Sequence, residues 1–128
     1  MVAGTQSEGV ACSVKHFALN SQETNRNTQA VDMADLRPLW EVYYTPFAAA
    51  VEAGVASVMC SYNRVRTAAQ PEGAYEHACG NAQLLQRDLK GAMGFEGWVM
   101  SDWWAIHDSA ASAHGVDQEM PGDQKPRL

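Results

Sequence analysis

Short apolar runs that end in polar residues recur along the chain and predict its strands. They lie at residues 11–17, 55–62 and 97–102, and a weaker run lies at 115–120. Apolar runs of this length that do not alternate are typical of strands buried on both faces, as in parallel sheets. The pattern therefore predicts three buried strands and a fourth, weaker one.

Helices are predicted between these strands, each starting at a capping residue. Asp35, Thr45 and Asn81 are favoured N-cap residues, and Pro46 after Thr45 suits the first helical position. The helix after Thr45 is expected to end at Gly54. Their predicted apolar faces carry Leu39, Trp40 and Tyr43, then Phe47, Ala50 and Val51, then Leu84, Leu85 and Leu89. A short helix is predicted from Asp108, and residues 20–27 and 65–80, which lack any period, are predicted to be loops.

The alternation of strands and helices predicts an α/β fold with a parallel sheet and right-handed crossovers. We expect a partial (β/α)8 TIM-type barrel, roughly its second half, because a complete barrel needs about 250 residues and the chain has 128. On this interpretation the chain is a fragment of something longer. A doubly wound open sheet is the alternative, and it fits a chain of this length.

Composition narrows the function classes. The net charge is −6 without a Lys/Arg cluster, which argues against a nucleic-acid partner. No apolar run reaches the length of a membrane span. The N-terminus lacks a signal-peptide pattern, so the sequence gives no compartment. Three cysteines make no disulfide framework, and Cys12 and Cys60 are expected to be buried, inert thiols. His77 and Cys79 lack a second ligand pair, so no metal is expected.

Reactive side chains follow each of the three main strands: Lys15 and His16, then Met59 to Tyr62, then Asp102 and Trp103. In a (β/α)8 barrel these strand ends converge on the catalytic face. Indole rings pack on sugars, Lys and His donate hydrogen bonds to hydroxyl groups, and a carboxylate attacks an anomeric carbon. We expect a nearby Lys15 to keep Asp102 ionised.

Other interpretations of the same residues stay open at this point. Asp102 also suits a cap for the following helix. Lys15 also suits a Schiff-base aldolase, or a plain exposed charge. His16 and Met59 also suit purely structural roles. A non-catalytic sugar-binding or scaffold protein would carry the same fold.

Several collinear segments resemble glycoside hydrolase family 3. The first is Lys15-His16-Phe17-Ala18-Leu19-Asn20 with Gln22-Glu23-Thr24-Asn25-Arg26, which is similar to the KHF-x-x-N-x-x-E-T-N-R motif. The others are Val58-Met59-Cys60-Ser61-Tyr62-Asn63, Gly94-Phe95-Glu96-Gly97-Trp98-Val99-Met100-Ser101-Asp102-Trp103 and Gly115-Val116-Asp117 with Met120-Pro121-Gly122. Ala18-Leu19-Asn20 departs from the loop of the bacterial N-acetylhexosaminidase branch, which disfavours that branch.

The resemblance implies a retaining β-glycosidase of the β-glucosidase type that acts on a β-glucoside or related oligosaccharide without metal or organic cofactor. Asp102 would be the catalytic nucleophile. The substrate-binding residues would be Lys15, His16, Met59, Tyr62 and Trp103, with Arg26 in a supporting role.

The resemblance also implies that residues 1–128 are a fragment of the N-terminal (β/α)8 domain. The mechanism needs a second carboxyl group as acid and base. In the β-glucosidase-like branch that group comes from a second domain, which we expect to be absent from this chain. Glu119 matches no acid/base motif. We therefore expect little or no turnover from these residues alone.

Overall fold

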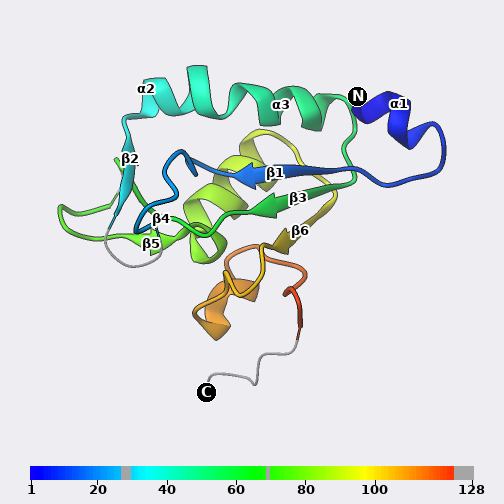
Figure 1. Cartoon of the computed structure of the whole chain (residues 1–128). Helices are drawn as coiled ribbons and strands as arrows, with labels where there is room; N and C mark the ends of the chain where they lie inside the picture. The colour runs from blue at the N-terminus through cyan, green and yellow to red at the C-terminus, as the bar shows by residue number, and fades with distance from the viewer. Residues whose placement is uncertain (27–29, 69, 123–128) are drawn as a thin grey trace.

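The computed structural model describes residues 1–26, 30–68 and 70–122, and it has an α/β fold (Figure 1). The strands are β1 (Ser13–Phe17), β2 (Asp32–Ala34), β3 (Ser57–Cys60), β4 (Arg64–Thr67), β5 (Glu76–His77) and β6 (Trp98–Ser101). The helical segments are α1 (Val2–Gln6), α2 (Leu36–Pro38), η1 (Leu39–Tyr43), α3 (Thr45–Glu52), η2 (Ala78–Gly80), η3 (Gln83–Ala92) and η4 (Ser109–Ser112).

The three predicted main strands form one parallel sheet in the order β1-β3-β6. Its central strand, β3, is buried at every position, as an apolar run without alternation predicts. The prediction of a buried strand was wrong for most of β1 and half of β6, the two outer strands of this sheet, where Ser13, Lys15 and Trp98 are exposed. Lys15, Met59 and Met100 lie side by side in register across the sheet. The parallel register brings the carboxyl ends of all three strands to one edge, where the polar residues follow.

The helical run formed by α2, η1 and α3 is joined to the sheet and to the separate helix η3. The run continues almost without a break beside β1 (Figure 1). From this run, Tyr44 is fully buried and stacks on Phe17 at 5.1 Å between ring centroids. Its hydroxyl donates to Asp88 Oδ2 of η3 at 2.9 Å. Tyr44 therefore links its own helical run to β1 and to η3.

The capping predictions have mixed outcomes. Asn81 Oδ1 accepts from Leu84 N at 3.1 Å, and Asp108 accepts from Ala110 N at 2.8 Å, so both are confirmed as capping residues. Asp35 occupies the N-cap position of α2, but its side chain makes no capping bond. Thr45 was wrongly predicted as a cap: it is the first residue of α3, Tyr44 occupies the N-cap position with helical backbone angles, and the Thr45 hydroxyl donates to the Glu41 carbonyl of the preceding segment at 2.8 Å.

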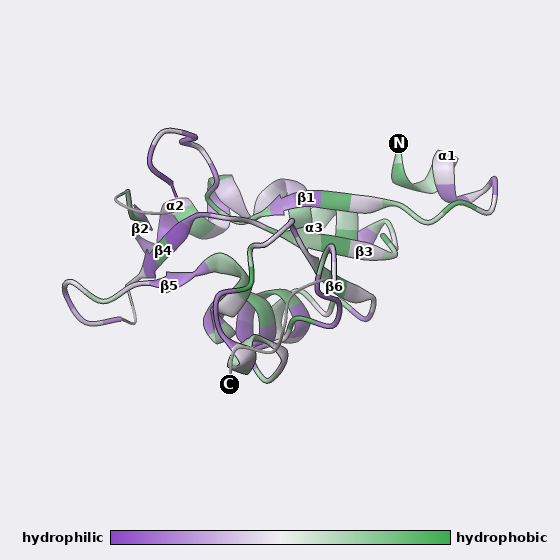
Figure 2. Cartoon of the chain, turned by 60° about the horizontal axis from the view of Figure 1, so that its bottom comes forward, coloured by the Kyte–Doolittle hydropathy of each residue, from purple (hydrophilic) through white to green (hydrophobic). Residues whose placement is uncertain are grey.

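A second sheet occupies the region predicted to be a loop, so that prediction was wrong. Strand β4 pairs with β2 in parallel and with β5 antiparallel. These strands are short and largely polar, as the hydropathy colours of Figure 2 show. Arg64 supports the pairing, because its Nε donates to the Ala30 carbonyl at 3.1 Å and its guanidinium lies over Tyr75. This sheet is held together by polar contacts, so it lacks the apolar run by which a strand is predicted from sequence.

The predicted loop at 20–27 is described up to residue 26, and residue 27 lies outside the described ranges.

The prediction of inert thiols was wrong for Cys60. It forms a disulfide with Cys79, with 5.2 Å between the Cα atoms. Cys12 is free and half-buried. The disulfide forms because the end of β3 meets η2, and that meeting depends on the second sheet that the sequence did not reveal.

The weaker predicted strand at 115–120 is reduced to a single parallel bridge between Met100 and Gln118. The side chain of Asp117 accepts from Val99 N at 2.7 Å, and this bond takes an amide of β6 that a longer ladder would use. No helix in the described part of the chain is long and apolar enough to cross a membrane.

Candidate active site

Asp102 lies immediately after β6, and the other strand ends surround it. Its amide donates to the carbonyl of Cys60, the last residue of β3, at 3.3 Å. Its Oδ2 lies 3.1 Å from His16 Nε2 of β1. The side chain of Asp102 is 15% exposed and that of His16 is 29% exposed. The following helix is capped by Asp108, so the alternative that Asp102 caps it was wrong.

The imidazole of His16 is held in its neutral form. Burial lowers the pKa of His16 below the ordinary 6.5, and this outweighs the raising effect of Asp102, with Lys15 and Arg26 lowering it further. Near neutral pH the contact with Asp102 is therefore a hydrogen bond from a neutral N–H rather than an ion pair. Because the pKa of His16 is lower in the folded chain than in the unfolded chain, the unfolded chain binds the proton more readily. Acidification below about pH 6.5 therefore lowers the contribution of His16 to the free energy of unfolding.

Tyr62 lies beside Asp102. Burial raises the pKa of the Tyr62 hydroxyl, and the neighbouring Asp102 carboxylate raises it further, while Arg26 lowers it. The hydroxyl is therefore a protonated neighbour of the carboxylate. Arg26 lies over the Tyr62 ring at 4.6 Å, and its Nη1 contacts Glu23 Oε1 at 2.6 Å. His16, Tyr62 and Arg26 thus form one contiguous cluster with Asp102.

The other predicted site residues lie around this cluster. Lys15 is exposed, and in the described part of the chain Asp102 pairs with His16 and not with Lys15. Met59 is 8% exposed. Trp103 and Trp104 are 37% and 53% exposed, so both indole rings are accessible to a ligand.

Sequence reasoning missed a buried polar group beside the site. Ser61 and Asn63 flank Tyr62, are both fully buried, and hydrogen-bond each other at 2.6 Å. Asn63 Nδ2 also donates to Asp32 Oδ2 of β2 at 2.9 Å. The available signal was the run of three polar residues at the end of an apolar strand, where buried polar groups need partners.

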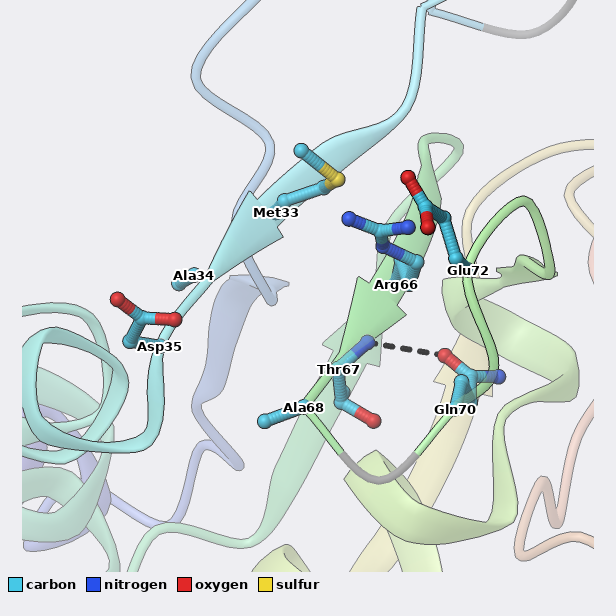
Figure 3. Close-up of a pocket in the computed structure, with 8 residues that line it drawn as sticks. All are labelled: Met33, Ala34, Asp35, Arg66, Thr67, Ala68, Gln70 and Glu72. Atoms are coloured by element: carbon cyan, nitrogen blue, oxygen red, sulfur yellow. Dashed lines mark hydrogen bonds between the residues drawn. The ribbon is translucent and has the colours of Figure 1, made fainter.

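The described cavities lie away from the predicted residues. One, of about 520 Å³, lies between β2 and β4 and is lined by Asp35, Arg66, Gln70 and Glu72 among others (Figure 3). Another, of about 210 Å³, is lined by three histidines, His77, His107 and His114, with two carboxylates and Gly80. Among the described residues, no group of three or more His, Cys, Asp or Glu is arranged to hold a metal ion.

Comparison with known proteins places the chain in a family. Residues 1–120 match the family model described as the glycosyl hydrolase family 3 N terminal domain. The chain is 48% identical over 122 residues to beta-glucosidase cel3A of Pyricularia oryzae, covering 94% of this chain and 16% of that protein. It therefore spans about a sixth of the length of such a relative.

Solved structures similar to this chain are also beta-glucosidases. Beta-D-glucoside glucohydrolase from Trichoderma reesei superposes with a TM-score of 0.82 at 43% identity, covering 94% of this chain and 16% of that one. DesR, a beta-glucosidase from Streptomyces venezuelae solved with D-glucose, gives a TM-score of 0.78 at 37% identity, covering 99% of this chain and 16% of that one. The chain belongs to glycosyl hydrolase family 3, with residues 1–120 matching its N-terminal domain.

Proposed function

We propose that this chain carries the nucleophile of a retaining β-glucosidase that releases terminal β-D-glucosyl residues. The observation that carries the proposal is the place of Asp102 at the carboxyl end of β6, where His16 Nε2 lies 3.1 Å from its carboxylate and Tyr62 lies beside it. Named relatives are beta-glucosidases, and one was solved with D-glucose. Both are consistent with a glucoside substrate.

The proposed chemistry starts with attack of Asp102 on the anomeric carbon. The bond to the leaving group breaks as the bond to the carboxylate forms, and water then hydrolyses the glycosyl-enzyme. A nucleophile must be ionised and accessible. The neutral imidazole of His16 donates to the carboxylate and orients it, and the 15% exposure of Asp102 leaves it open to a substrate.

Substrate recognition is assigned to the residues around Asp102. Lys15 is exposed beside the site and supplies an ammonium donor for sugar hydroxyl groups. The indole of Trp103 offers a face for the sugar ring, and Met59 lies beside Lys15 on the neighbouring strand. Arg26 supports Tyr62 by lying over its ring.

The second carboxyl group that the mechanism needs would come from residues outside this chain. Retention requires it about 5–5.5 Å from the nucleophile. The chain would then form roughly the second half of a (β/α)8 barrel, whose three parallel strands present the site at their carboxyl ends. We expect the 128 residues alone to give little turnover of unactivated glucosides.

Replacement of the nucleophile tests the proposal. In the longest natural form of the protein, Asp102→Asn should lower kcat/KM for an aryl β-glucoside by roughly 10⁴-fold or more while the circular dichroism spectrum is unchanged. Asp108→Asn is the matched control, because it makes the same change six residues away and asparagine caps a helix as well as aspartate. Activity of Asp102→Asn equal to that of the control would refute the assignment.

A further inference from the structure

Two consecutive backbone carbonyls after His16 are held on either side of Tyr62. The Phe17 carbonyl accepts from Ser61 N at 2.9 Å. The Ala18 carbonyl accepts from Asn63 Nδ2 at 3.1 Å. These bonds join the segment that carries His16, which contacts Asp102, to the segment that carries Tyr62.

The hydrogen bonds of Asn63 fix the orientation of its amide. Ser61 Oγ lies 2.6 Å from Asn63 Oδ1 and 3.2 Å from the Ala18 carbonyl, and its one proton serves the shorter contact. Both protons of Asn63 Nδ2 are then used, one on the Ala18 carbonyl and one on Asp32 Oδ2 at 2.9 Å. An amide has two donors and one carbonyl acceptor, so this arrangement satisfies it fully.

Burial makes this network selective for asparagine. Ser61 and Asn63 are both 0% exposed, so water cannot replace a lost partner. A carboxylate in place of the amide would face the Ala18 carbonyl and the Asp32 carboxylate with acceptors only. The shape would be kept, and two hydrogen bonds would become repulsions.

We infer that Asn63 is a positioning residue for the nucleophile: its buried amide holds the His16 segment against the Tyr62 segment, so that the imidazole of His16 meets Asp102 in one geometry. Asn63 does not contact the reacting atoms in this account. The inference rests on the proposed function, because it assigns Asn63 a role in the reaction of Asp102. It adds Ser61 and Asp32 as the partners through which that role is exerted.

The test compares two buried asparagines in the longest natural form of the protein. Asn63→Asp should lower kcat about 100-fold, as expected when reacting groups are displaced by about 1 Å, with a smaller effect on KM. Asn81→Asp is the matched control: Asn81 is equally buried, its Oδ1 caps η3, and its Nδ2 has no hydrogen-bond partner among the described residues. It should keep kcat within about threefold of the unsubstituted protein.

The pH profile separates positioning from a general loss of structure. Protonation of the introduced carboxyl group restores a donor, so the residual activity of Asn63→Asp should rise relative to the unsubstituted protein as the pH falls. The profile of Asn81→Asp should not change shape. If Asn63→Asp does not fold, Ser61→Ala replaces it, and we expect a loss of about tenfold in kcat because the amide loses its orienting donor.

Failure of this inference is distinguishable from failure of the proposed function. The unsubstituted protein is first reacted with an activated 2-deoxy-2-fluoro-β-glucoside, which reports the function alone. If Asp102 is labelled and Asn63→Asp is labelled at the same rate with an unchanged pH profile, the inference is wrong and the function stands. If the folded, unsubstituted protein is not labelled at Asp102, both are wrong.

Discussion

The two sheets of this molecule are built on different principles. The β1-β3-β6 sheet is built on an apolar central strand, with every position of β3 buried, and Phe17, Val58 and Val99 of its three strands join one core with the helices. The β2-β4-β5 sheet is short and polar (Figure 2). It depends on guanidinium, amide and carboxylate contacts. The first sheet sets the strand ends at which Asp102 lies, and the second supports that edge through Asp32 and the disulfide. The first sheet thus determines where Asp102 lies, and the second sheet adds contacts that support this position.

The largest stability effect is expected where the two sheets are joined. The disulfide links Cys60 at the end of β3 to Cys79 after β5, with a sequence separation of 19. Loops of this length give about 3 kcal/mol of stabilisation in the chain-entropy model. The double variant Cys60→Ala/Cys79→Ala should lose about this free energy of unfolding in urea denaturation.

The free thiol provides the control for that experiment. Cys12→Ala alters a half-buried cysteine outside both sheets and should change the free energy of unfolding by less than about 1 kcal/mol. An equal loss in Cys12→Ala and in the double variant would show that the link between the sheets contributes nothing.

A smaller effect is expected inside the core of the first sheet. Asp88 is 2% exposed and is held by the Tyr44 hydroxyl at 2.9 Å and by Arg87 Nε at 2.8 Å. Tyr44→Phe removes one hydrogen-bond donor and leaves the buried Asp88 carboxylate short of a partner. This should lower the free energy of unfolding by about 2 kcal/mol. Tyr43→Phe is the adjacent, more exposed control and should be nearly neutral. Equal denaturation midpoints for the two variants would contradict this description of the core.

The smallest effect is expected in the second sheet. Arg64 lies over the ring of Tyr75 at 4.3 Å, and Tyr75 is 44% exposed. Tyr75→Leu removes this cation–π contact and should cost about 0.5–1 kcal/mol in thermal or urea unfolding. Tyr75→Phe keeps an aromatic face and should be nearly neutral. A loss for Tyr75→Leu larger than that for Tyr44→Phe would reverse the proposed ranking of the two sheets.

The same contrast explains what sequence could predict. The parallel pairing of β1, β3 and β6 and the burial of β3 follow from pattern, whereas the prediction of buried strands was wrong for most of β1 and half of β6. Asn81 and Asp108 follow from capping chemistry. β4 was missed because Arg64 and Arg66 interrupt it, and arginines in a strand are stabilised only by partners distant in sequence. The Cys60–Cys79 bond was missed for the same reason.

The site was predictable to a similar extent. The strand ends identified Asp102, His16 and Tyr62 as neighbours, and motif resemblance gave them roles. Lys15 was expected to be the charge partner of Asp102, but it is exposed beside Met59, while His16 makes the contact. The positioning by Asn63 was not predictable, because it depends on a carbonyl 45 residues away and on Asp32 of the second sheet.

The most direct test of the central claim is covalent trapping of the nucleophile. The longest natural form of the protein is incubated with a panel of activated 2-deoxy-2-fluoro glycosides, and the labelled peptide is mapped by mass. The fluorine slows hydrolysis of the intermediate, and the good leaving group makes a strong acid catalyst unnecessary. The account predicts a label on Asp102 with the β-glucoside, absent in Asp102→Asn. A folded protein that takes no label across the panel, or takes it on another carboxylate, would contradict the account.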